Sequence, residues 1–186
     1  MISLNITSLE NPQFVKPMRI NYVLNGKSLS WEAVKSHDSV AILLYDHSSD
    51  SFVLVKQFRP PVYVNDKQHL HTYELCAGII DKSCSVEQIA KEEVDEECGY
   101  DIAVDRIEKI TSFFTNVGVS GAKQHLFFAQ VDASMKVHKG GGIDTESIEL
   151  EYLHVSEAKA FIFDESKAKT PGLMFAFYWF FEKFRG

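Results

Sequence analysis

A short acidic segment, residues 86–98, places the strongest constraint on how this chain folds. Ser85 followed three residues later by Gln88 is typical of a helix start, because both side chains can pair with backbone groups that a new helix leaves free. Gly99 is typical of a helix end, where the backbone turns left-handed. The segment is therefore predicted to form one helix. Since a helix turns about 100° per residue, the direction of each side chain follows from its position.

Charged side chains of this helix fall on the face that should pack against the core. Counted from Val86, three apolar residues form one stripe at about 300°, 40° and 80°: Ile89, Ala90 and Val94. Glu93 and Glu97 fall inside the stripe at about 340° and 20°, and Glu96 lies beside it at about 280°. Buried carboxylates are costly unless they are paired, protonated or bound to a metal. We therefore expect the acidic part of the stripe to face a hard divalent cation such as Mg²⁺.

Length, composition and charge exclude several classes of protein. The 186 residues are enough for one sizeable core, and 45% of them are hydrophobic, which is typical of a globular chain. The net charge of -7 argues against a nucleic-acid groove as the main function. An acidic protein that acts on an anionic substrate needs a metal to offset its own charge, which agrees with the helix analysis.

The N-terminus and the cysteines favour a cytoplasmic protein. Residues 1–5 contain no basic side chain and begin no long apolar stretch, so we expect no signal peptide. The longest apolar run, residues 173–181, is too short to span a bilayer, so we expect no membrane association. Cys76, Cys84 and Cys98 are odd in number and lack the pairing of a zinc site, which favours reduced thiols.

The chain is predicted to divide into a small N-terminal β subdomain, residues 1–36, and a larger domain, residues 37–186. Alternating apolar and polar residues flank Asn25-Gly26, a strong signal for a hairpin. The larger domain mixes strands and helices without a regular βαβ rhythm, which favours an α+β fold with a mixed sheet and helices on its faces. Its expected strands are residues 39–45, 52–58, 73–80, 107–115, 124–131 and 148–155, and further helices are expected from Ser156 and from Gly172.

Seven residues carry a specific spacing: Gly78, Glu93, Val94, Glu96, Glu97, Gly99 and Tyr100. This spacing resembles the Nudix box, Gly-x5-Glu-x7-Arg-Glu-U-x-Glu-Glu-x-Gly-U, where U is a bulky apolar residue. Cys84 replaces the first glutamate of the box and Glu92 replaces its arginine. In the family those two residues help to shape the loop and orient the catalytic glutamates; Lys91 and Glu87 are nearby, but neither is in register. Because the metal-binding glutamates match, we interpret the two departures as changes that tune the activity of the site rather than abolish it.

The resemblance extends beyond the box. Residues 39–62 and 74–78 are similar to the Nudix branch that cleaves nucleotide sugars, and residues 117–124 are especially similar to UDP-sugar diphosphatases. ADP-ribose pyrophosphatases instead tend to carry a proline in this last loop, where this chain has Val117. The resemblance implies the Nudix fold, an α/β/α sandwich preceded by a small antiparallel β subdomain.

The resemblance implies Mg²⁺-dependent hydrolysis, with Mn²⁺ as the alternative ion, of a UDP-glucose-like nucleotide sugar to a nucleoside monophosphate and a sugar 1-phosphate. The metal neutralises the diphosphate and makes a bound water a usable nucleophile near neutral pH. The expected metal ligands are Glu93, Glu96 and Glu97, whose helical spacing lets them converge. The backbone carbonyl of Ala77 is expected to add a ligand, as is common in this branch.

A base and the substrate contacts are expected from three other segments. In the ADP-ribose branch the base is an acidic residue on a mobile loop before the last strand, which here implies Glu146 first and Asp144 second. The glycines at 140–142 would let that loop close over the substrate, and a plain flexible linker is the alternative. Arg59 is expected to bind phosphate bidentately, with a surface ion pair as its alternative. Lys123 is the second candidate for phosphate binding. The alternative is that its side chain simply faces solvent.

Related enzymes pack their N-terminal strands across a two-fold axis, so we expect a homodimer through the hairpin at 18–34. Three functional alternatives stay open. One is an ADP-ribose pyrophosphatase that yields AMP and ribose 5-phosphate. Another is a non-catalytic module that senses a nucleotide, which Cys84 and Glu92 favour. The third is an enzyme that removes oxidised nucleoside triphosphates.

Overall fold

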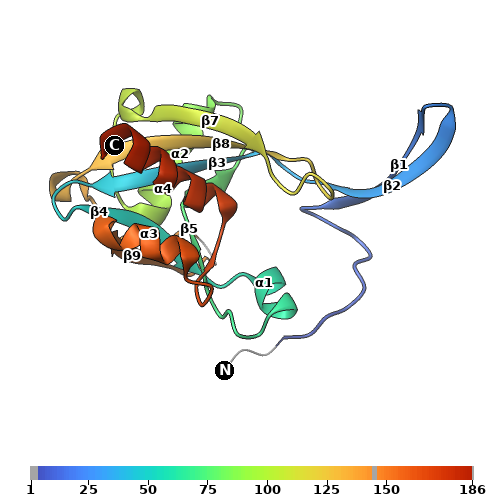
Figure 1. Cartoon of the computed structure of the whole chain (residues 1–186), viewed down its shortest axis with the longest axis horizontal. Coiled ribbons are helices and arrows are strands. Elements are labelled where there is room, and N and C mark those ends of the chain that lie inside the picture. Colours follow the sequence, from blue (N-terminus) through green and yellow to red (C-terminus); the bar gives the residue numbers. More distant parts are fainter. Residues whose placement is uncertain (1–3, 144–145, 186) are drawn as a thin grey trace.

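A mixed sheet of eight strands organises the protein (Figure 1). The computed structural model describes residues 4–143 and 146–185. The strands of the sheet are β3 (Ser39–Asp46), β4 (Ser51–Gln57), β5 (Thr72–Glu74), β6 (Cys76–Ile79), β7 (Glu108–Phe114), β8 (Lys123–Val131), β9 (Ile148–His154) and β10 (Ala168–Lys169). Their order is β10-β5-β4-β3-β8-β7, with β6 paired to β3 and β9 paired to β4. Because β3 runs antiparallel to β4 and parallel to β8, the predicted mixed sheet is confirmed.

Helices cover both faces of this sheet, as an α/β/α sandwich requires (Figure 1). The helices are α2 (Val86–Cys98) on one face and α3 (Val155–Phe163) and α4 (Pro171–Phe184) on the other. Strand β3 shows how the sequence allows this: Val40 and Ile42 pack with α2, whereas Ala41 and Leu43 pack with α3 and α4. Successive side chains of a strand point to opposite faces, so a strand buried on both faces reads as a continuous apolar run.

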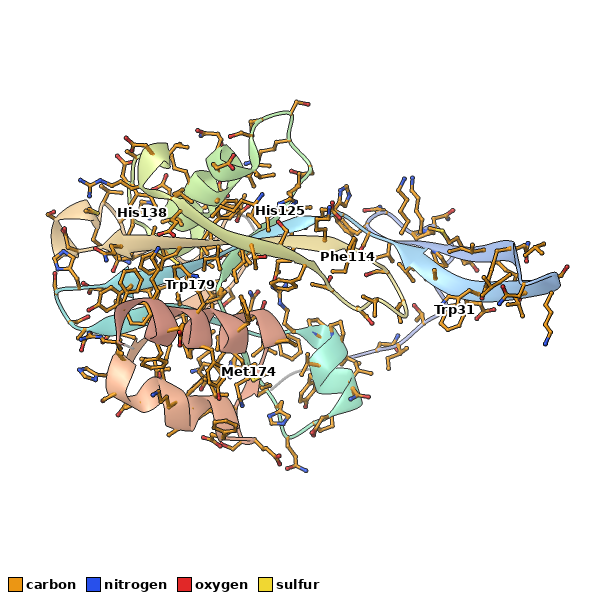
Figure 2. The ribbon with its side chains drawn as sticks, turned by 45° about the horizontal axis from the view of Figure 1, so that its top comes forward. Trp31, Phe114, His125, His138, Met174 and Trp179 are labelled. Atoms are coloured by element: carbon orange, nitrogen blue, oxygen red, sulfur yellow. The ribbon has the colours of Figure 1, made fainter. Side chains whose placement is uncertain are left out.

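The aromatic residues of α4 belong to the core. Phe177 stacks on Phe52 of β4 with ring centroids 4.4 Å apart, and Phe180 meets the same ring edge-on at 4.8 Å. Both α4 rings are buried. Figure 2 shows Trp179 on this helix, close to the sheet. No helix within the described ranges has both the length and the apolar character needed to cross a membrane.

The predicted hairpin is formed by β1 (Lys16–Leu24) and β2 (Lys27–Lys35) and projects from the body (Figures 1 and 2). Asn25 and Gly26 have φ values of 52° and 74°, as a tight two-residue hairpin turn requires. Two hydrogen bonds join β2 to the loop before β8. Trp31 Nε1 donates to the Gly118 carbonyl at 2.9 Å, and the Val34 N–H donates to the Val119 carbonyl at 2.8 Å.

Some short elements differ from the prediction. A helix, α1 (Pro60–Asn65), follows β4 where only a strand end was expected, because a proline suits the first turn of a helix as well as it ends a strand. The single strand expected at 73–80 is divided at Leu75 into β5 and β6, which pair with different neighbours, β4 and β3. Strand β10 and the 3-10 turns η1 (Val104–Arg106) and η2 (Ala133–Met135) are too short to leave a periodic signal.

Candidate active site

The acidic helix α2 begins and ends where the sequence predicts. The Ser85 hydroxyl oxygen accepts a hydrogen bond from the Gln88 N–H at 3.1 Å. At the other end Gly99 has φ 68°, and its N–H donates to the Asp95 carbonyl at 2.7 Å. The buried side chains of the helix are Ile89, Ala90, Val94, Glu97 and Cys98. One carboxylate is therefore buried among apolar residues, as the stripe predicts.

Glu97 is the most deeply buried acidic side chain of the site, with 4% of its surface exposed. Its Oε2 accepts a hydrogen bond from the Ala77 N–H of β6 at 2.9 Å. Burial raises the pKa of Glu97 to about 8, the Ala77 N–H partly opposes that shift, and the charge of Glu93 adds to it. A neighbouring cation would favour the ionised form that burial disfavours.

Glu93 lies against the glycine that opens the sequence motif. Burial, followed by the charge of Glu96, raises the pKa of Glu93 to about 7. A Cβ atom added at Gly78 would overlap the Glu93 carboxylate. A side chain at position 78 would therefore have to displace the Glu93 carboxylate, the end of a flexible side chain, from its place beside strand β6.

One cleft of about 420 Å³ brings most of the predicted site together. Its lining contains six of the residues proposed from the sequence: Arg59, Ala77, Glu93, Glu96, Glu97 and Glu146. These residues come from segments up to 87 positions apart in the chain, and the sheet places them around one opening. A cleft of this size, with convergent carboxylates on one side, is typical of a small-molecule site.

The oxygen donors of this cleft fit a hard divalent cation, but they do not form a complete cage. Across residues 4–143 and 146–185, no three acidic, histidine or cysteine side chains converge closely enough to hold an ion alone. Mg²⁺ commonly takes one or two carboxylates and completes its shell with water and substrate phosphate oxygens. Glu93 and Glu97 provide such carboxylates beside an open cleft. The donor set is therefore compatible with Mg²⁺ that is bound together with a phosphorylated substrate.

The glycines at 140–142 are anchored to the C-terminal end of α2. The Gly141 N–H donates to the Glu97 carbonyl at 2.9 Å, and the Gly142 N–H donates to the Glu96 carbonyl at 3.2 Å. These bonds satisfy carbonyls that a helix end leaves free. All three glycines have positive φ, and a Cβ at Gly140 would overlap the backbone of Glu97. The glycines thus follow a defined backbone path against the end of α2 in this structure, and the closing lid that the sequence suggests stays a prediction.

This anchored segment leads to Glu146, the first candidate for the base. Glu146 lines the cleft, and its Oε2 accepts a hydrogen bond from the Ile143 N–H at 3.1 Å. Its own N–H donates to the Ile143 carbonyl at 3.0 Å. The carboxylate thus lies beside Ile143, which directly follows the glycines tied to the helix of the other acidic residues. Asp144, the second candidate, lies outside the described residues.

The two candidates for phosphate binding have different surroundings. Arg59 lines the cleft, but its Nε and Nη2 donate to the two carboxylate oxygens of Glu74, each at 2.8 Å. The planar fork expected to hold phosphate therefore holds a carboxylate in the structure. The Nζ of Lys123 lies 5.4 Å from the centre of the Phe114 ring, and the cleft lining includes the neighbouring Gln124 instead.

An ion pair that sequence reasoning missed lies at the edge of the cleft. Lys82 Nζ donates to Glu92 Oε2 at 2.6 Å and joins the loop after β6 to helix α2. Glu92 is one of the two departures from the motif. Lys91 and Glu87 lie near the two departures in sequence, but neither is in register. Lys91 instead pairs with Asp101 at 3.0 Å. Because Lys82 precedes Glu92 by ten residues in an irregular loop, no helical or strand periodicity connects the two.

Comparisons with known proteins agree with this geometry. The model of the NUDIX domain family matches residues 35–171. The chain is 36% identical over 196 residues to the uridine diphosphate glucose pyrophosphatase NUDT14 of Bos taurus. The aligned region covers 90% of this chain and 88% of that protein. The protein of the same name from Mus musculus is 33% identical over 198 residues, covering 91% and 89%. The GDP-mannose pyrophosphatase of Pectobacterium atrosepticum is 37% identical over 127 residues, covering 68% and 64%.

Proposed function

Because this chain belongs to the NUDIX domain family, we propose that it is a hydrolase that cleaves the pyrophosphate bond of nucleoside diphosphate sugars. Water adds to one phosphorus, the bridging P–O bond breaks, and the products are a nucleoside monophosphate and a sugar 1-phosphate. The observation that carries this proposal is the pair of carboxylates Glu93 and Glu97, held in one cleft by Gly78 and by the Ala77 N–H. The names of the relatives, which specify UDP-glucose and GDP-mannose, support a nucleotide sugar as the substrate class.

The proposed cofactor is Mg²⁺, with Mn²⁺ as an alternative, held by Glu93, Glu96 and Glu97 and by the Ala77 carbonyl. When bound, such an ion neutralises the diphosphate and lowers the pKa of water. The protein contributes orientation: the Ala77 N–H fixes one oxygen of Glu97, and close packing against Gly78 limits the movement of Glu93. Burial of these side chains raises their affinity for a cation, because a charged carboxylate in a poorly solvated site lacks other stabilisation.

Glu146 is proposed as the base that accepts the proton of the attacking water. Its place in the cleft lining and its tie to the end of α2 support this role. Arg59 is proposed to contact a substrate phosphate in the cleft, keeping Glu74 as the partner that orients its guanidinium. Lys123 remains a second candidate only if its side chain leaves the Phe114 ring.

A panel of nucleotide sugars tests the proposed reaction. The purified protein is incubated with UDP-glucose, GDP-mannose, ADP-ribose and a nucleoside triphosphate at fixed Mg²⁺, and monophosphate products are measured by chromatography. We expect turnover of one or more nucleotide sugars that EDTA abolishes. Preference for ADP-ribose would identify the alternative substrate, and preference for the triphosphate would contradict the proposal. Binding without turnover of any compound would support the sensing module.

We also propose that the protein forms a homodimer through its hairpin. Cross-strand neighbours make one face of the hairpin apolar, with Ile20 opposite Trp31 and Tyr22 opposite Leu29. All four side chains are exposed in one copy. A two-stranded hairpin is marginally stable in water, and a second copy offers the same apolar face by two-fold symmetry.

A matched pair of substitutions tests the homodimer. Ile20→Glu places a charge on the apolar face, whereas Val23→Glu places one on the opposite face of the same strand. Light scattering should report a monomer for Ile20→Glu and a dimer for both Val23→Glu and the unchanged protein. A monomeric unchanged protein would contradict the proposal.

For the cell compartment, the three free cysteines support the reducing cytoplasm.

A further inference from the structure

Lys82 lies between two carboxylates of the same helix. Its Nζ is 2.6 Å from Glu92 Oε2 and 4.0 Å from Glu96 Oε1. Glu92 and Glu96 are four residues apart, so they lie on the same side of α2, one turn from each other. Glu96 lines the cleft, and so does Lys82. The lysine therefore has two possible partners, and in the structure it takes Glu92, which is not among the residues that line the cleft.

The preferred partner is itself held in place. Gln88 Nε2 donates to Glu92 Oε1 at 3.1 Å, while Lys82 occupies the other oxygen. Both oxygens of Glu92 thus have donors, and the side chain is fixed along the helix surface. These contacts make Glu92 a stable anchor for the ammonium group.

We propose that Glu92 is a positioning residue that keeps Lys82 off Glu96, so that Glu96 stays available to a divalent cation. The inference rests on the proposed function, in which Glu96 is a metal ligand. Without the charge of Glu92, the nearest carboxylate to Lys82 is Glu96. An ammonium group paired with Glu96 would compete with a divalent cation for the same oxygens. The acidic residue at the arginine position of the motif then has a defined task, which is to bind the lysine that this chain carries at position 82.

The predicted effect is a coupling between two substitutions, which a double-mutant cycle measures. Glu92→Gln should weaken cation binding, because Lys82 moves to Glu96. Lys82→Met should leave binding unchanged or strengthen it. The double variant should bind about as well as Lys82→Met, since the competing ammonium group is absent. If Glu92 acted only through its negative charge, Glu92→Gln would weaken cation binding equally with Lys82 present and with Lys82→Met.

The probe is Mn²⁺, whose free concentration is measured by electron paramagnetic resonance at constant ionic strength without substrate. We expect Glu92→Gln to raise the dissociation constant about threefold to fivefold, the size of an exposed lysine–carboxylate interaction. Asp101→Asn is the matched control: it removes the carboxylate partner of another lysine, Lys91 of α2, outside the cleft. That control should bind Mn²⁺ like the unchanged protein. Thermal unfolding in EDTA checks that each variant folds.

Three results would overturn the inference. One is a dissociation constant for Glu92→Gln within error of the unchanged protein. Another is a double variant that binds as weakly as Glu92→Gln. The third is Mn²⁺ binding that Glu96→Gln leaves unchanged. Failure of the proposed function is a separate result, because the Mn²⁺ cycle needs no substrate. If the Mn²⁺ dissociation constants follow the expected double-mutant cycle but no nucleotide sugar is hydrolysed, the role of Glu92 is retained and the proposed hydrolase activity is rejected.

Discussion

The backbone N–H of Ala77 donates a hydrogen bond to Oε2 of Glu97 at 2.9 Å, and this contact joins strand β6 to helix α2 inside the cleft. The next residue, Gly78, lies against the carboxylate of Glu93. Two consecutive residues of one strand therefore orient two carboxylates of one helix. The strand and the helix act as a single unit that holds the acidic side chains at the base of the cleft.

Glu97→Gln should lower kcat by at least about a hundredfold, because the positioning of a catalytic cation accounts for several kcal/mol of barrier lowering. The glutamine retains an oxygen that can accept the Ala77 N–H, so the fold should persist. Steady-state rates with UDP-glucose or GDP-mannose, together with circular dichroism, make the comparison. A variant with nearly normal kcat would show that Glu97 does not hold the metal.

Gly78→Ala should reduce activity, because the new methyl group displaces the Glu93 carboxylate. It should change stability by at most about 1 kcal/mol, because that carboxylate ends a flexible side chain. Gly118→Ala is the matched control, since a Cβ at Gly118 meets no atom within 4 Å. Initial rates should separate the two variants, and denaturant unfolding measures their stability. Equal stability and activity of both would argue against close packing between Gly78 and Glu93.

The stability of the metal-free protein should fall as the pH rises from about 5 to about 8. Burial raises the pKa of Glu93 from 4.5 to about 7 and that of Glu97 from 4.5 to about 8, so the folded state binds more protons than the unfolded state in this window. Stability then decreases with pH, and for Glu97 the loss is on the order of a few kcal/mol.

Thermal unfolding in EDTA at several pH values measures this dependence. Glu97→Gln should flatten the curve, because glutamine does not titrate. Excess Mg²⁺ at pH 8 should restore stability to the unchanged protein more than to the variant, by binding the ionised form. A melting temperature of the metal-free protein that rises steadily from pH 5 to pH 8 would contradict the assignment of raised pKa values.

Glu146→Gln should lower kcat by about a hundredfold or more if this carboxylate is the base, with a smaller change in KM. Glutamine can still accept the Ile143 N–H, so this contact should be retained. The pH profile of kcat should lose its acidic limb in the variant. An unchanged profile would move the role of base to another residue, and Asp144→Asn would be the next variant to measure.

Sequence patterns predict helix α2 well because its determinants are local. The cap at Ser85, the stop at Gly99 and the spacing of Glu93 and Glu97 all depend on residues within one helix. The hairpin turn at Asn25-Gly26 is local in the same sense, since its positive φ values suit those two residues. Such features follow from helical and strand geometry, so they can be read before any tertiary contact is known.

Contacts between segments behave differently. Arg59 pairs with Glu74 through Nε and Nη2, and Lys82 pairs with Glu92; no periodicity in the sequence indicates either partner. The glycines at 140–142 suggested mobility, yet their N–H groups bind carbonyls of α2. In each case the partner comes from an element that is distant along the chain or joined through an irregular loop.

By itself, the sequence determined which residues form the acidic helix, the motif and family to which they belong, and the alternation that buries β3 on both faces. Only the tertiary structure decided which backbone donor orients Glu97, which side chain lies against position 78, and which carboxylate binds Lys82. The physical reason is the distance along the chain over which each interaction acts. Helix turn and strand alternation act over a few residues, whereas close packing and hydrogen bonding between elements depend on how the sheet brings distant segments together.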